Sequence, residues 1–330
     1  MAKSSAKENE NCQARLLYQY PKPTTKDLFT DTFGFITKTK EAESSMHSVF
    51  KLKHRWERML NDGRTECMDG MVFKGVPVFL KNRVWTYVLR GKNKHKEVGW
   101  EEYEKLRDMH SGFEYQIHVD IQRTFRNHIL FYDAFGEGQC KLFRVLVAYA
   151  NYNPHIGYCQ GMASFTGLIL MYFDELEVFN VLINILSTLN ALFDTQLSLL
   201  PTLMSVQKEV FILVIPEVYY LLKNENVDLC LFVYSWYLTL FSRFDIKLSL
   251  RIWDIFIFYG PASLLAVSCA ILSFYVRRLG EMQGECLVAF LSSLDSIALA
   301  DSDVDCIIEK VKGVMEEIDL DDINNVLELY

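Results

Sequence analysis

Apolar residues recur along most of this chain at intervals of three and four, the spacing of amphipathic or buried α-helices. In residues 45–60 they fall on one helical face, and residues 139–150 repeat the pattern. No run alternates apolar and polar residues between hairpin turns, as half-buried strands do. The pattern predicts an all-α protein. In its second half the expected helices are residues 175–193, 203–223, 227–241, 247–259, 262–279 and 284–294.

Turn residues indicate where several helices begin and end. Pro77 at a first helical turn and Gly91 after the last apolar position bracket one helix. Another helix is expected over residues 114–131, where apolar residues share one stripe. The stretch 255–276 carries no charge, but Gly260-Pro261 interrupts it. It therefore predicts two buried helices rather than a membrane-spanning helix.

Changes in composition divide the chain into four segments. Residues 1–30 are polar and predict a flexible N-terminal tail, and residues 31–70 predict a helical segment before the main domain. Residues 71–290 predict one large helical domain. Residues 301–330 contain ten acidic residues and two lysines, so residues 291–330 predict an acidic C-terminal helical extension.

Composition limits the class of function. Half of the 330 residues are hydrophobic, which is enough for a large core. The 42 Asp and Glu outnumber the 34 Lys and Arg, so nucleic acid is not expected as the main ligand. The eight cysteines are scattered without a CxxC pair, as in a reducing compartment. The first residues are polar and charged, so no signal peptide is expected and the protein is predicted to be cytoplasmic.

The sequence lacks the usual motifs for nucleotide or metal binding. Gly136-Glu137-Gly138 precedes Gln-Cys-Lys, whereas a phosphate-binding loop ends in Gly-Lys-Ser/Thr. No Cys and His pairs have zinc-ligand spacing. His155 and Cys159 lie four residues apart across an expected bend, and we interpret Cys159 as a packed residue rather than a nucleophile. No cofactor and no metal of its own are expected.

Two short motifs are more distinctive. In Ile117-x-x-Asp120-x-x-Arg123 a helix would place the acid and the base on one face. On that spacing alone, an ordinary surface ion pair is the better explanation. The second motif is Tyr158-Cys159-Gln160-Gly161, within an uncharged stretch that runs from Val145 to Phe173. It is also explained by a polar loop that enters a buried helix, with the glutamine capping backbone groups.

Taken in order, these motifs and two others resemble the TBC domain of Rab GTPase-activating proteins. The others are Lys74-Gly75-Val76-Pro77 with Arg83-Val84-Trp85, and Arg251-Ile252-Trp253-Asp254. The resemblance covers roughly residues 70–290, and with FGFI at Phe33–Ile36 it is most like the RN-tre branch. It implies a fold of two helical subdomains that form a V-shaped groove. It also implies structural roles for Pro77, Trp85, Arg251, Trp253 and Asp254.

The resemblance further implies a mechanism. Arg123 would be an arginine finger and Gln160 a glutamine finger, both supplied to a GTP-bound Rab protein to accelerate hydrolysis. Asp120, Tyr158 and Gly161 would support them, with Gly161 allowing a close approach or an unusual backbone angle. GTP and Mg²⁺ would belong to the partner. The implied role is in vesicle traffic, with recruitment to endomembranes through the partner.

Two alternatives remain open on the sequence alone. The chain could be a catalytically silent TBC scaffold that binds a GTPase or another protein, or a structural helical adaptor in which the motifs are coincidental. The intact Arg123 and Gln160 favour an activator. Arg126 lies close to Arg123, but the position of the motif selects Arg123.

Overall fold

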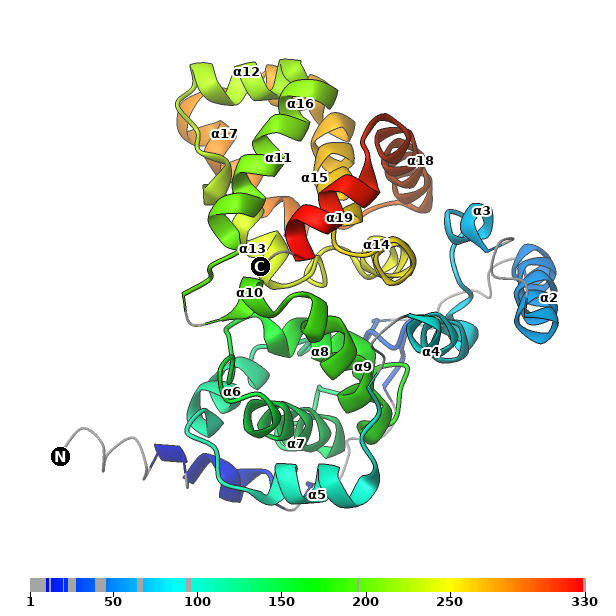
Figure 1. The fold of residues 1–330 in the computed structure, drawn as a ribbon, viewed down its shortest axis with the longest axis vertical. Helices are drawn as coiled ribbons and strands as arrows, with labels where there is room; N and C mark the ends of the chain where they lie inside the picture. Colours follow the sequence, from blue (N-terminus) through cyan, green and yellow to red (C-terminus); the bar gives the residue numbers. More distant parts are fainter. Residues whose placement is uncertain are drawn as a thin grey trace. The chain divides into compact units, whose positions relative to one another are not determined.

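The computed structural model describes residues 10–11, 13–19, 21–22, 28–38, 46–63, 68–92, 96–194 and 196–328. Within these residues the chain is helical and has no β-strand, only isolated bridges (Figure 1). The prediction of an all-α protein is confirmed. None of the described helices combines the length and the apolar content that crossing a membrane requires.

The chain divides into two compact units. Unit 1 comprises the described residues of Met1–Arg55, Pro77–Thr188 and Phe193–Thr195. Unit 2 comprises those of Trp56–Val76, Leu189–Leu192 and Gln196–Tyr330. Helix α2 (Met46–Asp62) and helix α10 (Asn190–Phe193) each contribute residues to both units.

Unit 1 is built around helix α7 (Glu137–Tyr152), which packs against four other helices (Figure 1). Leu142, Phe143 and every residue from Val145 to Ala150 are buried, which explains why this stretch of the sequence is almost free of charge. The other helices wholly in unit 1 are α4 (Lys81–Gly91), α5 (Trp100–Asp108), α6 (Glu114–Ile121), α8 (Met162–Leu170) and α9 (Glu175–Thr188), preceded by a 3₁₀ turn at Val78–Leu80.

Unit 2 is built around helix α15 (Ser263–Phe274), in which all residues from Ser263 to Leu272 are buried. Helix α14 ends at Tyr259 and α15 begins at Ser263, so the predicted break at Gly260-Pro261 is confirmed. The other helices wholly in unit 2 are α3 (Asp69–Val72), α11 (Leu200–Val214), α12 (Pro216–Asn224), α13 (Val233–Leu238), α14 (Ile246–Tyr259), α16 (Val276–Gly280), α17 (Gly284–Ser293), α18 (Asp301–Glu317) and α19 (Leu320–Glu328), with 3₁₀ turns at Leu229–Leu231 and Leu294–Ser296.

Five predicted helices differ from the structure. Those expected over 175–193 and 262–279 are each divided in two, and within 227–241 only Val233–Leu238 is α-helical, after a 3₁₀ turn. The other two are instructive. The helix expected over 114–131 ends at Ile121, and the following residues form irregular turns in which Phe125 has φ +44°. Neither glycine nor proline signals this end in the sequence. The helix expected over 203–223 is divided in two, because Pro216 has no backbone N–H and starts α12 at its first turn.

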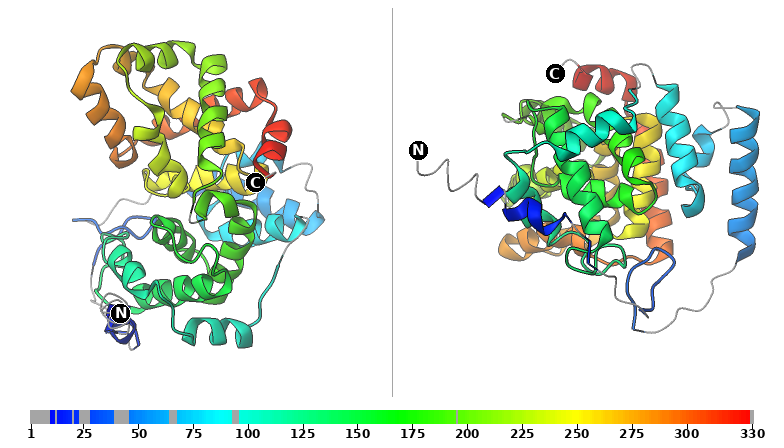
Figure 2. Two further views of the ribbon diagram at one scale, coloured as in Figure 1. Left: turned by 60° about the vertical axis from the view of Figure 1, so that its left-hand side comes forward. Right: turned by 90° about the horizontal axis from the view of Figure 1, so that it is seen from below.

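The N-terminal segment also differs from its prediction. Part of the expected flexible tail is helical in residues 10–11 and 13–17, and Tyr18 is only 2% exposed. Figure 2 shows these blue residues beside the teal helices of unit 1. The prediction of a flexible tail is therefore wrong for this part of the segment. The apolar run that contains Tyr18 is short and lies between polar residues, so it gave little sign of this burial.

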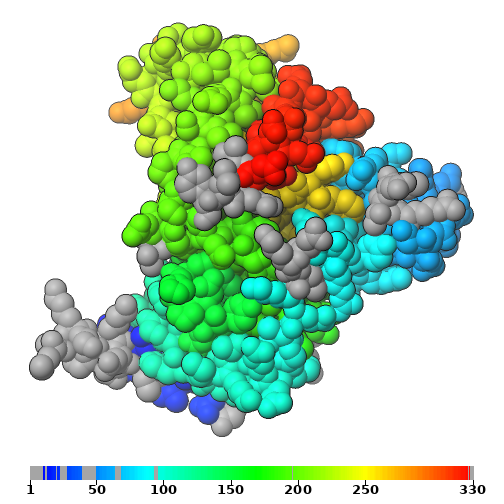
Figure 3. All heavy atoms as spheres, in the orientation of Figure 1, coloured from blue at the N-terminus to red at the C-terminus, as the bar shows by residue number. Residues whose placement is uncertain are grey.

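Most of the C-terminal acidic residues belong to helices α18 and α19 of unit 2. Figure 3 shows the red C-terminal helices at the surface beside the yellow α14. Asn324 of α19 holds the turn between α14 and α15, because its amide nitrogen donates to the carbonyl of Tyr259 and its oxygen accepts from the N–H of Ala262. The apolar face of these helices is inward, and the acidic residues lie in the solvent.

Two predicted structural residues of α14 hold one loop of unit 2, and a third, which lies between them in the sequence, is buried. The carboxylate of Asp254 accepts a hydrogen bond from the N–H of Val76 at 2.8 Å, and Arg251 donates to the carbonyl of Phe73. Gly75 has φ +83°, and a Cβ there would lie 2.8 Å from Cδ of Arg251. Trp253 is fully buried and its indole N–H donates to the carbonyl of Leu240. The two motifs thus fasten residues 73–76 to α14.

The other two structural residues, Pro77 and Trp85, lie in the segment of unit 1 that begins at Pro77. Pro77 precedes the 3₁₀ turn and its carbonyl accepts from the N–H of Leu80 at 2.8 Å. Trp85 on α4 is fully buried and stacks on Phe173 with 6.0 Å between ring centroids. Neither side chain is available to a ligand, which agrees with structural roles.

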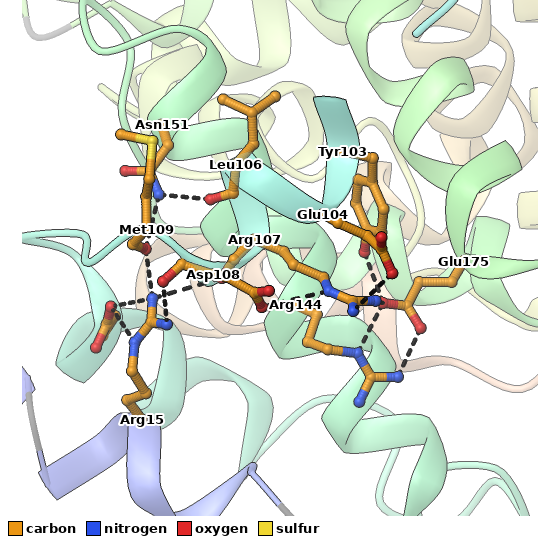
Figure 4. Close-up of polar contacts among 11 residues, drawn as sticks. Arg15, Tyr103, Glu104, Leu106, Arg107, Asp108, Met109, Arg144, Asn151 and Glu175 are labelled. Atoms are coloured by element: carbon orange, nitrogen blue, oxygen red, sulfur yellow. Dashed lines mark hydrogen bonds and ion pairs between the residues drawn. The ribbon is translucent and has the colours of Figure 1, made fainter. Parts of the chain in front are cut away.

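A buried ion pair joins α5, α7 and α9 (Figure 4). Arg144 donates to both oxygens of Glu175, at 2.7 and 2.6 Å, and the hydroxyl of Tyr103 donates to the same carboxylate at 2.7 Å. Burial alone would raise the pKa of Glu175, but the hydrogen bonds and positive charge of Arg144, with Tyr103 and Arg107, hold it below its ordinary value.

We expect Glu175→Gln to lower the free energy of unfolding by about 3 kcal/mol, because Arg144 then lacks its carboxylate. Thermal unfolding followed by circular dichroism measures this change. Glu104→Gln is the control, since Glu104 is half exposed where it pairs with Arg107, and it should have little effect. Folding lowers the pKa of Glu175, so its contribution is present above the unfolded pKa and declines as the pH falls below it. Equal melting temperatures for both variants would contradict the expectation.

Candidate functional site

The site is assembled at the end of α6. Asp120 lies in the last turn of this helix, and the chain then leaves the helical path. The carbonyl of Asp120 accepts hydrogen bonds from the N–H of Arg123 at 3.2 Å and from the hydroxyl of Thr124 at 2.8 Å. These contacts satisfy a carbonyl that a continuing helix would have used. As a result Arg123 projects from a turn and not from a helix face.

The carboxylate of Asp120 connects the two sequence motifs. Its side chain is 7% exposed, and its Oδ1 lies 2.6 Å from Nη2 of Arg123. Its Oδ2 accepts a hydrogen bond of 2.6 Å from the hydroxyl of Tyr158. One buried carboxylate therefore holds the arginine with one oxygen and the loop before α8 with the other. The ion pair predicted from the helical spacing exists, but its acidic partner is buried and does not lie on the surface.

Tyr158 is a buried hydrogen-bond donor. Burial, and then the negative charge of Asp120, raise the pKa of Tyr158 well above its ordinary value. The phenol thus stays protonated and donates to Asp120. Three residues later Gly161 has φ +109°, a backbone angle that favours glycine, and α8 starts at Met162. The unusual backbone angle expected at this glycine is what the structure has.

Gln160 lies between the anchored tyrosine and the glycine, and its side chain is exposed. Among the contacts of the described residues its carboxamide makes no hydrogen bond, so the interpretation of this glutamine as a backbone cap is wrong. Because the residues on either side are held by burial and by backbone geometry, the carboxamide is presented to the solvent from a fixed loop.

The two neighbouring arginines have different environments. The side chain of Arg123 is 59% exposed and its paired Nη2 is held by Asp120. A guanidinium has five N–H donors, so most of them remain available to a ligand. Arg126 is partly buried, and its Nη1 donates to the carbonyl of Phe131 at 3.0 Å. This contact gives Arg126 a role in holding the turns after α6.

Other chemistry is disfavoured at the site. Burial, and then the charge of Asp120, raise the pKa of the Cys159 thiol above its ordinary value, so a thiolate nucleophile is disfavoured. His155 is exposed and no described contact joins it to Cys159. In the part of the chain that the structure describes, no three His, Cys, Asp or Glu side chains are grouped to hold a metal ion.

A family model described as the Rab-GTPase-TBC domain matches residues 79–279. This match covers more than half of the chain, and the chain belongs to that family. The four sequence motifs lie in or directly beside the matched region.

Two curated relatives and one solved structure are similar to the chain. A Drosophila melanogaster protein, the ecotropic viral integration site 5 ortholog, is 30% identical over 226 residues, which are 66% of this chain and 28% of the relative. A TBC domain-containing protein of Schizosaccharomyces pombe is 29% identical over 304 residues, 89% of this chain and 36% of the relative. The chain thus spans about a third of the length of these relatives.

The solved structure is that of the Chlamydomonas flagellar RabGAP TBC domain. It has a TM-score of 0.71 at 21% identity, and the match covers 87% of this chain and 99% of that one. At this identity the likeness establishes the fold. The assignment to the RN-tre branch stays a prediction.

We expect Asp120→Asn to lower the free energy of unfolding by about 2 kcal/mol. The asparagine amide has a single neutral acceptor oxygen, so it cannot accept the hydrogen bonds of both Arg123 and Tyr158 as the two carboxylate oxygens do. Thermal unfolding measures the change. The control is Asp133→Asn, because Asp133 is less buried than Asp120 and lies later along the same irregular segment. A variant at Asp120 as stable as the wild type would show that the carboxylate does not hold the two motifs together.

Proposed function

We propose that this protein is a GTPase-activating protein for a Rab-family GTPase, with Arg123 and Gln160 as its two catalytic residues. One observation carries the proposal. A single buried carboxylate, Asp120, fastens the turn that bears an exposed arginine and the loop that bears an exposed glutamine. Membership of the Rab-GTPase-TBC family supports the choice of partner.

An arginine suits the charge that phosphoryl transfer develops. As the γ-phosphoryl group moves, negative charge spreads over its oxygens, and a permanently charged planar guanidinium donates several hydrogen bonds to them. The contact with Asp120 leaves Arg123 mostly exposed, so it approaches the nucleotide with free N–H groups. Water is excluded as the two proteins meet, and each charge then acts in a lower dielectric.

A glutamine suits the position of the attacking water. Its carboxamide has both an acceptor and a donor, so it orients water and contacts a phosphoryl oxygen at the same time. It is also neutral and adds no repulsion beside phosphate. The uncharged residues around Gln160 add no competing negative charge. GTP and Mg²⁺ come with the partner, and the protein acts in the cytoplasm, at endomembranes, through that partner.

The proposal is tested by phosphate release from a panel of GTP-loaded Rab proteins, each with and without the full chain. At least one Rab should hydrolyse GTP faster when the chain is added. The rate should saturate as the Rab concentration rises, because the chain acts as a catalyst. Binding to a Rab without any acceleration would establish a silent scaffold. No binding and no acceleration across the panel would contradict both functions.

A further inference from the structure

The N-terminal residues contact the first turn of α6. The side-chain oxygen of Asn11 accepts a hydrogen bond from the N–H of Tyr115 at 2.7 Å. Arg15 donates to Oε1 of Glu114 through Nε at 2.9 Å and Nη2 at 2.7 Å. It also donates to the carbonyls of Asp108 and Met109, at the end of α5 (Figure 4). One guanidinium therefore joins the end of α5 to the start of α6.

Arg15 compensates a buried charge. Glu114 is fully buried, and its Oε2 has no hydrogen-bond partner among the described residues. Its Oε1 also accepts from the N–H of Ser111 at 2.8 Å and lies 3.1 Å from Nδ1 of His110. A buried carboxylate needs such partners, and Arg15 supplies the permanent positive charge.

Tyr18 contacts the last turn of α6. Its ring stacks on Phe143 of α7 with 4.3 Å between centroids and an interplanar angle of 7°. Its hydroxyl lies 3.0 Å from Nδ1 of His118 and accepts from Nε2 of Gln122 at 3.0 Å. Burial lowers the pKa of His118 and so favours the neutral ring. With its proton on Nε2, that ring accepts a hydrogen bond at Nδ1 from the Tyr18 hydroxyl. One hydroxyl thus joins two residues a helical turn apart.

Gln122 connects Tyr18 to the turn that bears Arg123. It is the residue directly before Arg123, and its amide nitrogen also donates to Oε1 of Gln139 at 3.1 Å. Gln139 is fully buried in α7 and its amide nitrogen donates to the carbonyl of Phe131. The side chain before Arg123 is thereby fixed between Tyr18 and the core of unit 1.

We propose that Asn11, Arg15 and Tyr18, the N-terminal strap, hold both ends of α6 and so position Arg123 for catalysis. Helix α6 has only eight residues, and helices this short are not stable without tertiary contacts. The strap supplies such contacts from a segment distant in the sequence. Arg15 and Tyr18 are positioning residues, since they act through α6. The inference rests on the proposed function only for its catalytic part.

The test compares Tyr18→Phe with the wild type in the full chain. The variant keeps the stacked ring and loses only the hydroxyl. Amide hydrogen exchange in residues 118–124 should become about fivefold faster, while exchange in α14 and α15 stays unchanged. With an accelerated Rab, kcat should fall about tenfold with KM within about twofold, because the arginine is misplaced while binding surfaces remain.

Tyr103→Phe is the matched control. Tyr103 is fully buried in the same unit and loses one hydroxyl hydrogen bond to a carboxylate, which Arg144 still holds. It should lower the melting temperature without changing exchange in residues 118–124 or kcat. Arg15→Lys is a second variant, since lysine keeps the charge but cannot donate to Glu114 and two carbonyls at once. It should lower kcat in the same way as Tyr18→Phe.

The outcomes separate the strap from the proposed function. If the wild type accelerates no Rab, the proposed function fails, while faster exchange in Tyr18→Phe still supports the strap. Unchanged exchange in both Tyr18→Phe and Arg15→Lys would overturn the strap. Faster exchange with unchanged kcat would overturn its role in positioning Arg123. If Tyr103→Phe lowered kcat as much as Tyr18→Phe does, the loss would be a general effect of lower stability, and the positioning role of the strap would be overturned as well.

Discussion

Replacing Arg123 with alanine is expected to reduce the acceleration of Rab GTP hydrolysis by about 10³-fold or more, the contribution of an arginine supplied in trans. The fold should persist at a cost of about 1 kcal/mol, since the Arg123 side chain is 59% exposed and the buried Asp120 keeps its hydrogen bond from Tyr158. Phosphate release at saturating Rab measures the first effect, and thermal unfolding measures the second. Affinity for the GTP-bound Rab should change much less than the rate.

Arg243→Ala is a matched control for that variant. Arg243 is 52% exposed and pairs at 3.3 Å with Asp295, whose side chain is 8% exposed, so it matches the exposure of Arg123 and Asp120, which pair at 2.6 Å. It should cost a similar small amount of stability and leave the rate unchanged. Arg126→Ala is the decisive comparison nearby. If Arg126→Ala abolished acceleration and Arg123→Ala did not, the assignment of the arginine finger would be wrong.

Replacing Gln160 with alanine is expected to lower the rate about 10²-fold, the size of effect when one preorganised hydrogen-bonding group is lost. The carboxamide makes no hydrogen bond within the described chain, so the melting temperature should stay near the wild-type value. Gln160→Glu should be at least as damaging, because it places a negative charge beside phosphate. Single-turnover hydrolysis on a Rab that the wild type accelerates measures both.

The chain offers a close control for Gln160. Gln283 is also exposed and also precedes a glycine with positive φ, Gly284, at the start of a helix. Gln283→Ala removes an exposed glutamine side chain that directly precedes such a glycine at another helix start, and it should leave the rate unchanged. Full activity in Gln160→Ala would mean that the partner supplies its own glutamine, and the second finger would have to be abandoned.

Helix periodicity predicted the class of fold and the helical segments, but not where several of them break, because a buried face repeats every 3.6 residues wherever a helix packs on a core. The break at Gly260-Pro261 was predicted, whereas the break before Pro216 was missed although a proline marks it. The end of α6 at Ile121 was missed as well, because neither proline nor glycine marks it. At that end Thr124 donates to the carbonyl of Asp120 and Tyr158 donates to its carboxylate, and the second contact is tertiary, so no local pattern contains it.

The candidate site shows the same division. The sequence supplied the residue types and their order, and so the prediction that Arg123 and Gln160 act together. It held no sign that one carboxylate joins the two motifs, since Asp120 and Tyr158 are 38 residues apart. It also assigned residues 1–30 to a flexible tail, although Tyr18 is buried against α7. Ala14 and Tyr18 are spaced as on one helical face and both are buried, but two positions are too few to predict a packed helix.

By itself, then, the amino-acid sequence determined the helical class, the family resemblance and the identity of the two candidate catalytic side chains, all of which depend on local spacing or composition. Only the tertiary structure decided that Arg123 lies in the turn after the short helix α6 and that Arg126 donates a hydrogen bond to the carbonyl of Phe131. It also decided that N-terminal residues contact both ends of α6. Those properties depend on contacts between residues distant along the chain, and such contacts exist only after the chain has packed.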